Sequence, residues 1–186
     1  MSNLTREQIK RSKALSLVLR HKPETIGITL DDKGWADVKE LMQKWPSKFK
    51  QLQLTLAKLQ ETVEICPKQR FAFDESGNKI RCVQGHSVKV NPDLEAVQPP
   101  NQLFHGTATR FLDSIMKEGL VPKSRTLVHL SKDLEPATTV GSRHGKVAIL
   151  IVDSAKMHSL GYEFYLAENG VWLTERVPVE FIKENS

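Results

Sequence analysis

The stretch that decides the fold of the first half is Arg70-Phe71-Ala72-Phe73-Asp74-Glu75-Ser76-Gly77-Asn78-Lys79-Ile80-Arg81-Cys82-Val83. It holds two short β-favouring runs, residues 70–73 and residues 79–83, on either side of a polar segment that contains Ser-Gly-Asn. Glycine and asparagine between two such runs are typical of a β-hairpin. The sequence therefore predicts two antiparallel strands joined by a turn over residues 74–78.

Three helices are expected before this hairpin. The pattern Thr5-Arg6-Glu7-Gln8 is that of a capping box, so a helix should begin there and run to about Arg20, ahead of Pro23. Asp37 should cap a second helix. The residues expected to face inward are Ile9, Leu15, Val18 and Leu19, then Val38, Leu41, Met42 and Trp45, and in a third helix Leu52, Leu56, Leu59 and Val63. Three helices followed by a hairpin form the layout of a winged helix, a common nucleic-acid-binding fold, although a fold alone does not give function.

A change of composition divides the chain after residue 90. Residues 91–101 contain three prolines and no periodic pattern, which is typical of a linker. We therefore expect one domain over residues 1–90 and another over residues 102–186. The second should be a small α+β unit with a helix from about Ala108 to a glycine cap at Gly119. Its expected strands are residues 102–104, 127–130, 146–153, 162–166, 171–174 and 179–182, with Ser131 capping a short helix.

Basic residues are concentrated in the first half. Residues 1–90 hold 17 Lys and Arg against 10 Asp and Glu, whereas residues 91–186 hold 10 against 12. This asymmetry indicates a polyanionic partner for the first half, with a solvated basic surface as the alternative.

The composition, 39% hydrophobic and 26% charged, is that of a folded globular protein. The longest apolar run, residues 147–152, is too short to cross a membrane. Cys66 and Cys82 lack metal-ligand spacing, so we expect no bound metal, inert thiols and a cytoplasmic location. Glycine patterns of the Rossmann and P-loop types are absent from the sequence. The three tryptophans are expected in the core: Trp35, Trp45 and Trp172.

Three arginines are candidates for binding a phosphate. Arg20 closes the first helix, Arg81 lies in the hairpin, and Arg143 sits in a glycine-flanked turn of the second half. If the halves face each other, these guanidinium groups and His21 could converge on one phosphate, which arginine binds by parallel hydrogen bonds. Each arginine alone could equally be a surface residue or a salt-bridge partner.

Histidines form a second group of candidates, because imidazole can exchange a proton near neutral pH. His105 precedes Gly106 and Thr107, and the glycine would let another molecule approach the backbone closely. His129 and Ser131 should point to the same face of a strand, where the hydroxyl could contact a ribose. Lone histidines are more often structural, and the remaining members of the group are His21, His86 and His144.

In combination and in this order, the motifs resemble the RNA 2′-phosphotransferases, whose bacterial branch is called KptA. The matching segments are Leu15 to Lys22, Gly34-Trp35, Arg70-Phe71, Ile80 to Ser87, Leu103 to Thr107, Val128 to Ser131, Val140 to Gly145 and Asn169 to Thr174. The resemblance implies a winged-helix RNA lobe joined to an ADP-ribosyltransferase-like lobe that binds NAD. It also implies a substrate RNA with an internal 2′-phosphate, which is transferred to NAD in two steps.

Matched motif by motif, the resemblance implies the roles of particular residues. The catalytic group would be Arg20, His21, Arg81 and Arg143. The NAD-binding residues would be His105, Gly106, Thr107, His129 and Ser131. Val171 would stand where many protein-modifying relatives have a catalytic glutamate, which argues against protein modification.

Two other functions remain as alternatives. The first is a winged-helix nucleic-acid-binding regulator with a ligand-sensing second half, which predicts affinity for duplex DNA. The second is a protein or nucleic-acid ADP-ribosyltransferase, with Glu168 as a weak candidate for its glutamate. A monomer is expected, because no long apolar stripe is left over.

Overall fold

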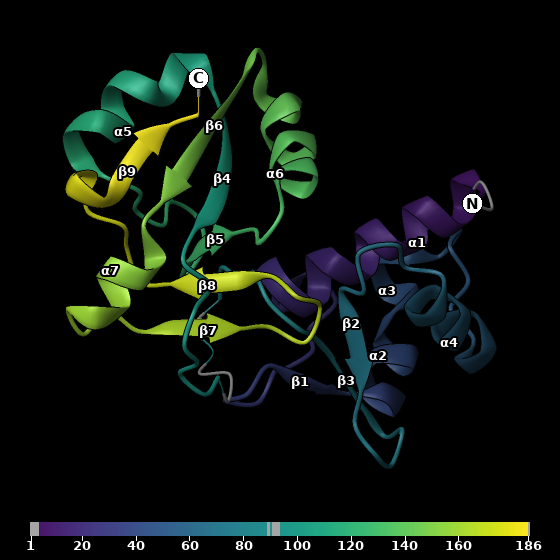
Figure 1. The fold of residues 1–186 in the computed structure, drawn as a ribbon. Helices are drawn as coiled ribbons and strands as arrows, with labels where there is room; N and C mark the ends of the chain where they lie inside the picture. Colours follow the sequence, from purple (N-terminus) through teal and green to yellow (C-terminus); the bar gives the residue numbers. More distant parts are fainter. Residues whose placement is uncertain (1–3, 89, 91–93, 186) are drawn as a thin grey trace. The chain divides into compact units, whose positions relative to one another are not determined.

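The structure is a computed structural model that describes residues 4–88, 90 and 94–185. Contacts divide the chain into two compact units, Met1–Asp93 and Leu94–Ser186 (Figure 1). Helices and three antiparallel sheets of three strands each make up the described residues, so the α+β class is confirmed. Residues 91–93 of the expected linker lie outside the described part of the chain. The residues after them are tied to unit 2, since Val97 N donates to Phe164 O at 2.8 Å.

Unit 1 opens with helix α1 (Arg6–Ser16), which begins where the sequence predicts. Gln8 N donates to Thr5 Oγ1 at 3.2 Å and Thr5 N donates to Gln8 Oε1 at 2.8 Å, so the capping box is confirmed. The helix continues as a π-helical turn, η1 (Leu17–His21). Its inward residues Leu15, Val18 and Leu19 are fully buried, but Ile9 is 40% exposed, so that inward assignment is wrong.

The remaining helices of unit 1 are short. Asp37 caps α2 (Val38–Lys44) by accepting from Glu40 N at 2.7 Å, as expected. The third predicted helix is α4 (Leu56–Glu64), and Leu52, which was expected on it, lies before its first residue. A further short helix, α3 (Pro46–Phe49), follows α2 and was not predicted. Pro46 explains why α3 is separate from α2, because proline suits the first turn of a new helix and not the interior of a longer one. The 3-10 turn η2 (Pro23–Thr25) follows η1.

The predicted hairpin supplies two strands of a three-stranded sheet, in which its second strand is the central one. Strands β2 (Phe71–Phe73) and β3 (Lys79–Cys82) pair antiparallel, with Ala72 opposite Arg81. A third strand, β1 (Trp35–Asp37), pairs with the other edge of β3 and was not predicted. The core of this unit gathers around Leu15, Leu19, Leu41, Trp45 and Ile80.

Unit 2 contains two sheets. In one, β6 (Val147–Val152) lies between β4 (Leu103–Ala108) and β9 (Ile182–Glu184). In the other, β8 (Trp172–Thr174) lies between β5 (Val128–Leu130) and β7 (Phe164–Leu166). The last strand comes later than predicted, because η5 (Val179–Phe181) is a 3-10 turn. The strand expected to end before His105 continues to Ala108.

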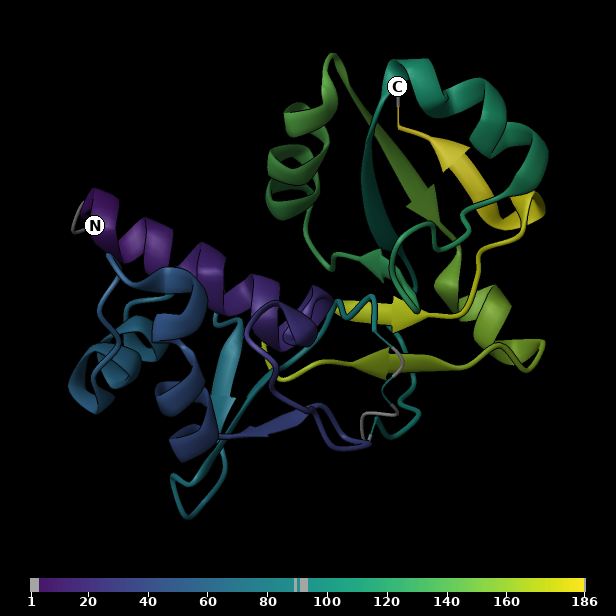
Figure 2. The same cartoon turned by 180° about the vertical axis from the view of Figure 1, so that it is seen from behind.

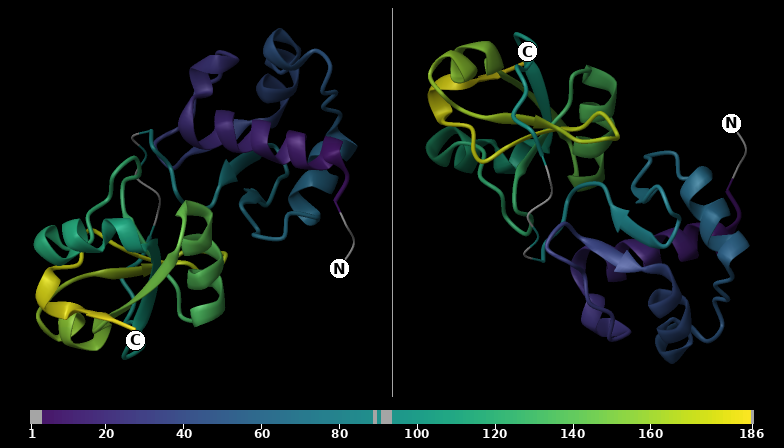
Figure 3. Two further views of the ribbon diagram at one scale, coloured as in Figure 1. Left: turned by 90° about the horizontal axis from the view of Figure 1, so that it is seen from above. Right: turned by 90° about the horizontal axis from the view of Figure 1, so that it is seen from below.

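Helices flank the first of these sheets. Figures 1, 2 and 3 agree in placing the sheet β4-β6-β9 between α5 (Leu112–Glu118) and α6 (Leu134–Gly141). Gly119 ends α5 with φ 80°, as predicted. The predicted cap at Ser131 is wrong, because α6 begins after Asp133 and Ser131 pairs instead with Phe104. The remaining short helical elements of unit 2 include two 3-10 turns, η3 (Thr109–Phe111) and η4 (Ser142–His144), and the α-helix α7 (Ser154–Ser159). No helix in the described residues has the length and apolar character needed to span a bilayer.

Candidate functional site

The end of η1 is joined to the motif that follows the hairpin. Ser87 N donates to the carbonyl oxygen of Arg20 at 3.0 Å. The Ser87 hydroxyl lies 2.9 Å from Nδ1 of His21, within hydrogen-bond distance. Residues far apart in the sequence, at 20–21 and 86–87, are thereby held together within unit 1.

Arg20 is the most unusual side chain of this site. It is only 7% exposed, and its Nε and Nη2 atoms are buried without a hydrogen-bond partner among the described residues. Burying a charged donor without a partner is costly, so such groups normally have one. A bound anion would satisfy these donors, and arginine is well shaped for a phosphate.

Arg81 is held on β3 by stacking. Its guanidinium carbon lies 4.3 Å from the centroid of the Trp35 ring, and the two residues are paired across strands β1 and β3. Trp35 is half-buried, so its assignment to the core was wrong, whereas Trp45 and Trp172 are buried. The strand that carries Trp35 has only three residues, too few for a recognisable sequence pattern. Its pairing with β3 is what places the Trp35 ring against Arg81.

His86 is buried within electrostatic reach of these cationic side chains. It is 2% exposed, and its pKa falls from 6.5 to about 4, first because of burial and then because of the positive charges of Arg20, His21 and Arg81. Its ring packs against Gly34, where a Cβ would lie 3.1 Å from Nε2. The structure thus brings three of the four predicted catalytic residues around one neutral histidine.

Cys82 also belongs to this neighbourhood. Burial raises its pKa to about 11, while the charge and hydrogen bond of Arg20 act in the opposite direction. Its thiol therefore stays protonated near neutral pH, as expected of an inert cysteine. Strand alternation predicts that the Cys82 side chain points away from Arg81. The interaction of Cys82 with Arg20 was not predicted.

Unit 2 brings together the residues expected to hold NAD. His105 Nδ1 is 3.0 Å from the carbonyl oxygen of His129, and His129 Nδ1 is 3.0 Å from that of Leu127. Ser131 N donates to Phe104 O at 2.8 Å. His105, His129 and Ser131 are half-buried, and burial is the main cause that lowers the pKa of His105. This edge between β4 and β5 offers two imidazoles and a hydroxyl.

A glycine is required at position 106 by the close packing of a helix against this strand. A Cβ there would meet the carbonyl oxygen of Ala137 and come 3.0 Å from Gly141 N. Its close neighbour on that side is therefore α6, because only a glycine lets the helix backbone rest on β4. Thr107 is buried beside it.

Arg143 lies on η4, between Gly141 and Gly145, and is exposed. It belongs to unit 2, whereas Arg20, His21 and Arg81 belong to unit 1. The side chain of His144 is outside what the structure describes. Within the described residues, no three His, Cys, Asp or Glu side chains gather as a metal site would require.

The known proteins that this chain resembles belong to one class of enzyme. A family model described as RNA 2′-phosphotransferase, Tpt1 / KptA family, matches residues 6–176. A probable RNA 2′-phosphotransferase of Agrobacterium fabrum is 52% identical over 171 residues, covering 92% of this chain and 91% of the relative. One of Pseudomonas fluorescens is 53% identical over 173 residues, covering 92% and 94%. One of Nostoc punctiforme is 49% identical over 177 residues, covering 95% and 96%.

These matches define a transferase. The chain belongs to the RNA 2′-phosphotransferase family, the Tpt1 / KptA family.

Proposed function

We propose that this protein is an NAD-dependent RNA 2′-phosphotransferase that moves an internal RNA 2′-phosphate to NAD. The observation that carries the proposal is Arg20, whose buried Nε and Nη2 lack a partner among the described residues and whose charge, with those of His21 and Arg81, acts on His86. Several cations gathered around one point suit a phosphate dianion. Membership of the family supports the same substrate chemistry.

In the first step the RNA 2′-phosphate attacks C1″ of the nicotinamide riboside. The glycosidic bond to nicotinamide breaks, nicotinamide leaves with the bonding electron pair, and an ADP-ribosylated phosphate remains on the RNA. The nucleophile is already an anion, so this step needs positioning more than a strong base. His105, Gly106, Thr107, His129 and Ser131 are proposed to hold the nicotinamide riboside end of NAD.

In the second step the ribose O2″ attacks the same phosphorus. The bond from phosphorus to the RNA 2′-oxygen breaks, the oxygen takes a proton, and ADP-ribose 1″,2″-cyclic phosphate is released. Arg20, Arg81 and Arg143 are proposed to neutralise the charge that develops on phosphorus. His21, held by Ser87 at 2.9 Å, is proposed to contact the phosphate or to transfer the proton.

The two units fit a division of labour. Residues 1–90 would form a winged-helix lobe that meets RNA, residues 91–101 a linker, and residues 102–186 an ADP-ribosyltransferase-like lobe for NAD. The β2–β3 hairpin after α4 supports the first assignment. Val171, in place of a catalytic glutamate, supports RNA over protein as the acceptor. We propose a cytoplasmic monomer, consistent with the free cysteines Cys66 and Cys82.

The test is to incubate the protein with a 2′-phosphorylated oligonucleotide, with and without NAD. Loss of the 2′-phosphate only with NAD is expected, and retention of the phosphate with NAD would overturn the proposal.

Arg81→Ala and Arg143→Ala should accumulate ADP-ribosylated RNA, because the first step is less dependent on charge neutralisation. Arg176→Ala, which removes an exposed arginine outside the proposed site, is the matched control and should behave as wild type. Transfer of label from NAD to protein, or tight binding of duplex DNA without release of nicotinamide, would favour the alternatives.

A further inference from the structure

A basic groove of about 650 Å³ lies at the start of α1 in unit 1. Arg6 and Lys10 of α1 line it together with Lys48 and Lys50, which lie in α3 and directly after it. All four side chains are exposed. None of the four takes part in an ion pair with another residue in the described ranges. The groove therefore presents positive charge that no neighbouring carboxylate compensates.

Glu7 is the one acidic residue that lines the groove. Its carboxylate accepts from Arg11 Nη2 at 2.6 Å and lies 3.4 Å from Lys58 Nζ. The hydrogen bond from Arg11 is the main cause that lowers the pKa of Glu7. The charge of this carboxylate is thus already matched by two other cations, and it does not cancel the four in the groove.

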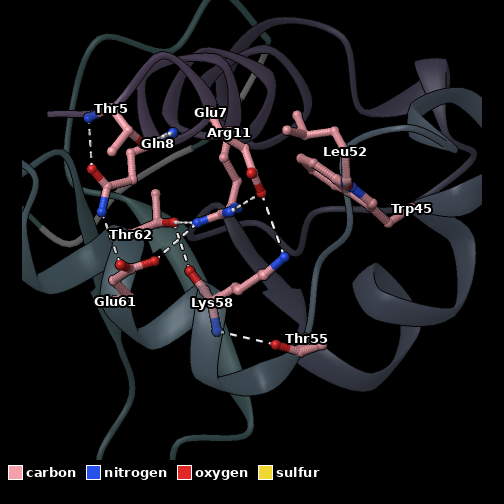
Figure 4. A network of polar contacts seen from close by, with 10 residues as sticks. All are labelled: Thr5, Glu7, Gln8, Arg11, Trp45, Leu52, Thr55, Lys58, Glu61 and Thr62. Atoms are coloured by element: carbon pink, nitrogen blue, oxygen red, sulfur yellow. Dashed lines mark hydrogen bonds and ion pairs between the residues drawn. The ribbon is translucent and has the colours of Figure 1, made fainter.

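An aromatic side chain also lines the groove. Phe49 is half-buried and lies against Trp45 with ring centroids 4.5 Å apart. Trp45 is in turn fixed by a hydrogen bond from Nε1 to the carbonyl oxygen of Leu52 at 2.6 Å, as Figure 4 shows. A firmly held ring among cations is a suitable surface for stacking a nucleobase.

One wall of the groove, the start of α1, is held by hydrogen bonds to a helix outside the groove. Figure 4 shows how α1 is tied to α4: Gln8 Nε2 donates to Glu61 Oε1 at 2.8 Å, and Arg11 Nη1 to Glu61 Oε2 at 3.1 Å. Arg11 itself is 2% exposed, so this connection is internal to the unit. A preformed binding surface loses less entropy when it takes up a flexible chain.

We propose that this groove binds single-stranded RNA, with phosphates on the four cations and a base on Phe49. The choice of RNA over other polyanions rests on the proposed function. Lys10 and Arg20 lie on one continuous helical stretch, α1 and η1, roughly 15 Å apart along its axis by the rise per residue. The groove is thus separate from the candidate phosphate site and would hold nucleotides that flank the reactive one.

The test is fluorescence anisotropy with a labelled, unstructured RNA that carries no 2′-phosphate, so binding is measured without turnover. The double variant Lys48→Gln with Lys50→Gln should weaken binding about tenfold. It should also reduce the slope of log affinity against log salt by about 1.4, since each lost contact to a single strand removes about 0.7. The matched control is Lys39→Gln with Lys183→Gln, which removes the same charge from exposed positions outside the groove and should bind as wild type.

Phe49→Leu examines the stacking surface separately from the charges. It keeps an apolar side chain against Trp45, and it should weaken RNA binding about fivefold or more while leaving the salt slope unchanged. A thermal melt of each variant shows that the fold is intact. Equal affinity in the wild type, the double lysine variant and Phe49→Leu would overturn the groove proposal, as would equal competition by poly-glutamate.

The result is independent of the reaction. If the wild type removes a 2′-phosphate with NAD but the groove variants bind RNA unchanged, the groove is wrong and the proposed function stands. If the groove variants lose RNA binding but the wild type never removes the phosphate, the proposed function is wrong and the groove stands.

Discussion

A Cβ atom on Gly34 would lie 3.1 Å from Nε2 of His86, so this glycine and this buried histidine are in direct contact. Gly34 also has φ 82°, in the left-handed region. Gly34→Ala should therefore combine backbone strain with a contact that His86 must relieve by moving. We expect a loss of about 2 kcal/mol in the free energy of unfolding, measured by urea denaturation.

Gly77→Ala is the matched control for this variant. Gly77 has φ 71°, but a Cβ there would meet nothing within 4 Å. Gly77→Ala adds backbone strain alone, so its free energy of unfolding should fall by only about 1 kcal/mol. If both variants lose the same stability, the contact between Gly34 and His86 has no energetic weight.

The neutral state of His86 predicts a pH dependence of stability. Its pKa is 6.5 when unfolded and about 4 when folded, so the unfolded chain binds the extra proton first as the pH falls. The contribution of His86 is complete above pH 6.5 and is lost between pH 6.5 and 4. The loss is roughly 3 kcal/mol for a shift of this size. His86→Asn should therefore show a smaller fall in unfolding free energy across this range than the wild type.

His158→Asn provides the comparison, because His158 is an exposed histidine of unit 2. Its denaturation curve should follow that of the wild type from pH 6.5 to 4. The same slope in His86→Asn as in the wild type would contradict the buried neutral imidazole.

Stacking of Trp35 on Arg81 should matter for the proposed reaction. Trp35→Leu removes the ring that holds the guanidinium at 4.3 Å, while an apolar side chain stays at this half-buried position. A cation–π contact of about 0.5–2 kcal/mol corresponds to a fall in kcat/KM of about two- to thirtyfold. Steady-state kinetics with a 2′-phosphorylated RNA measures this effect. Trp35→Phe should recover part of the activity, and equal activity in Trp35→Leu and wild type would argue against a positioning role.

Close packing of α6 on β4 predicts that Gly106 cannot be replaced. In Gly106→Ala the new Cβ would run into the backbone of Ala137, which no side-chain rotation can relieve. We expect a loss of more than about 3 kcal/mol, seen as a lower melting temperature or failure to fold. In Gly161→Ala a Cβ meets nothing within 4 Å, so the only destabilising effect should be the backbone strain of an alanine at φ 91°. A similar melting temperature for both variants would refute the steric account.

Local signals in the sequence were sufficient for much of the fold. The capping box at Thr5, the cap at Asp37, the β2–β3 hairpin and the C-cap at Gly119 depend on residues a few positions apart, and the structure confirms them. Errors arose where pairing between distant segments decides the outcome. The strand β1 is three residues long, and Ser131 pairs with Phe104 instead of capping a helix.

The sequence alone established the family, because its motifs are specific in combination and in order, and the comparisons confirm it. It also named the arginines and histidines, since side-chain chemistry can be recognised before the chain is folded. Only the tertiary structure could show that Nε and Nη2 of Arg20 are buried without a partner among the described residues, that Trp35 stacks on Arg81, and that burial and nearby cations lower the pKa of His86. The physical reason is that burial, stacking and pKa depend on which distant residues surround a group, and folding alone brings those residues together.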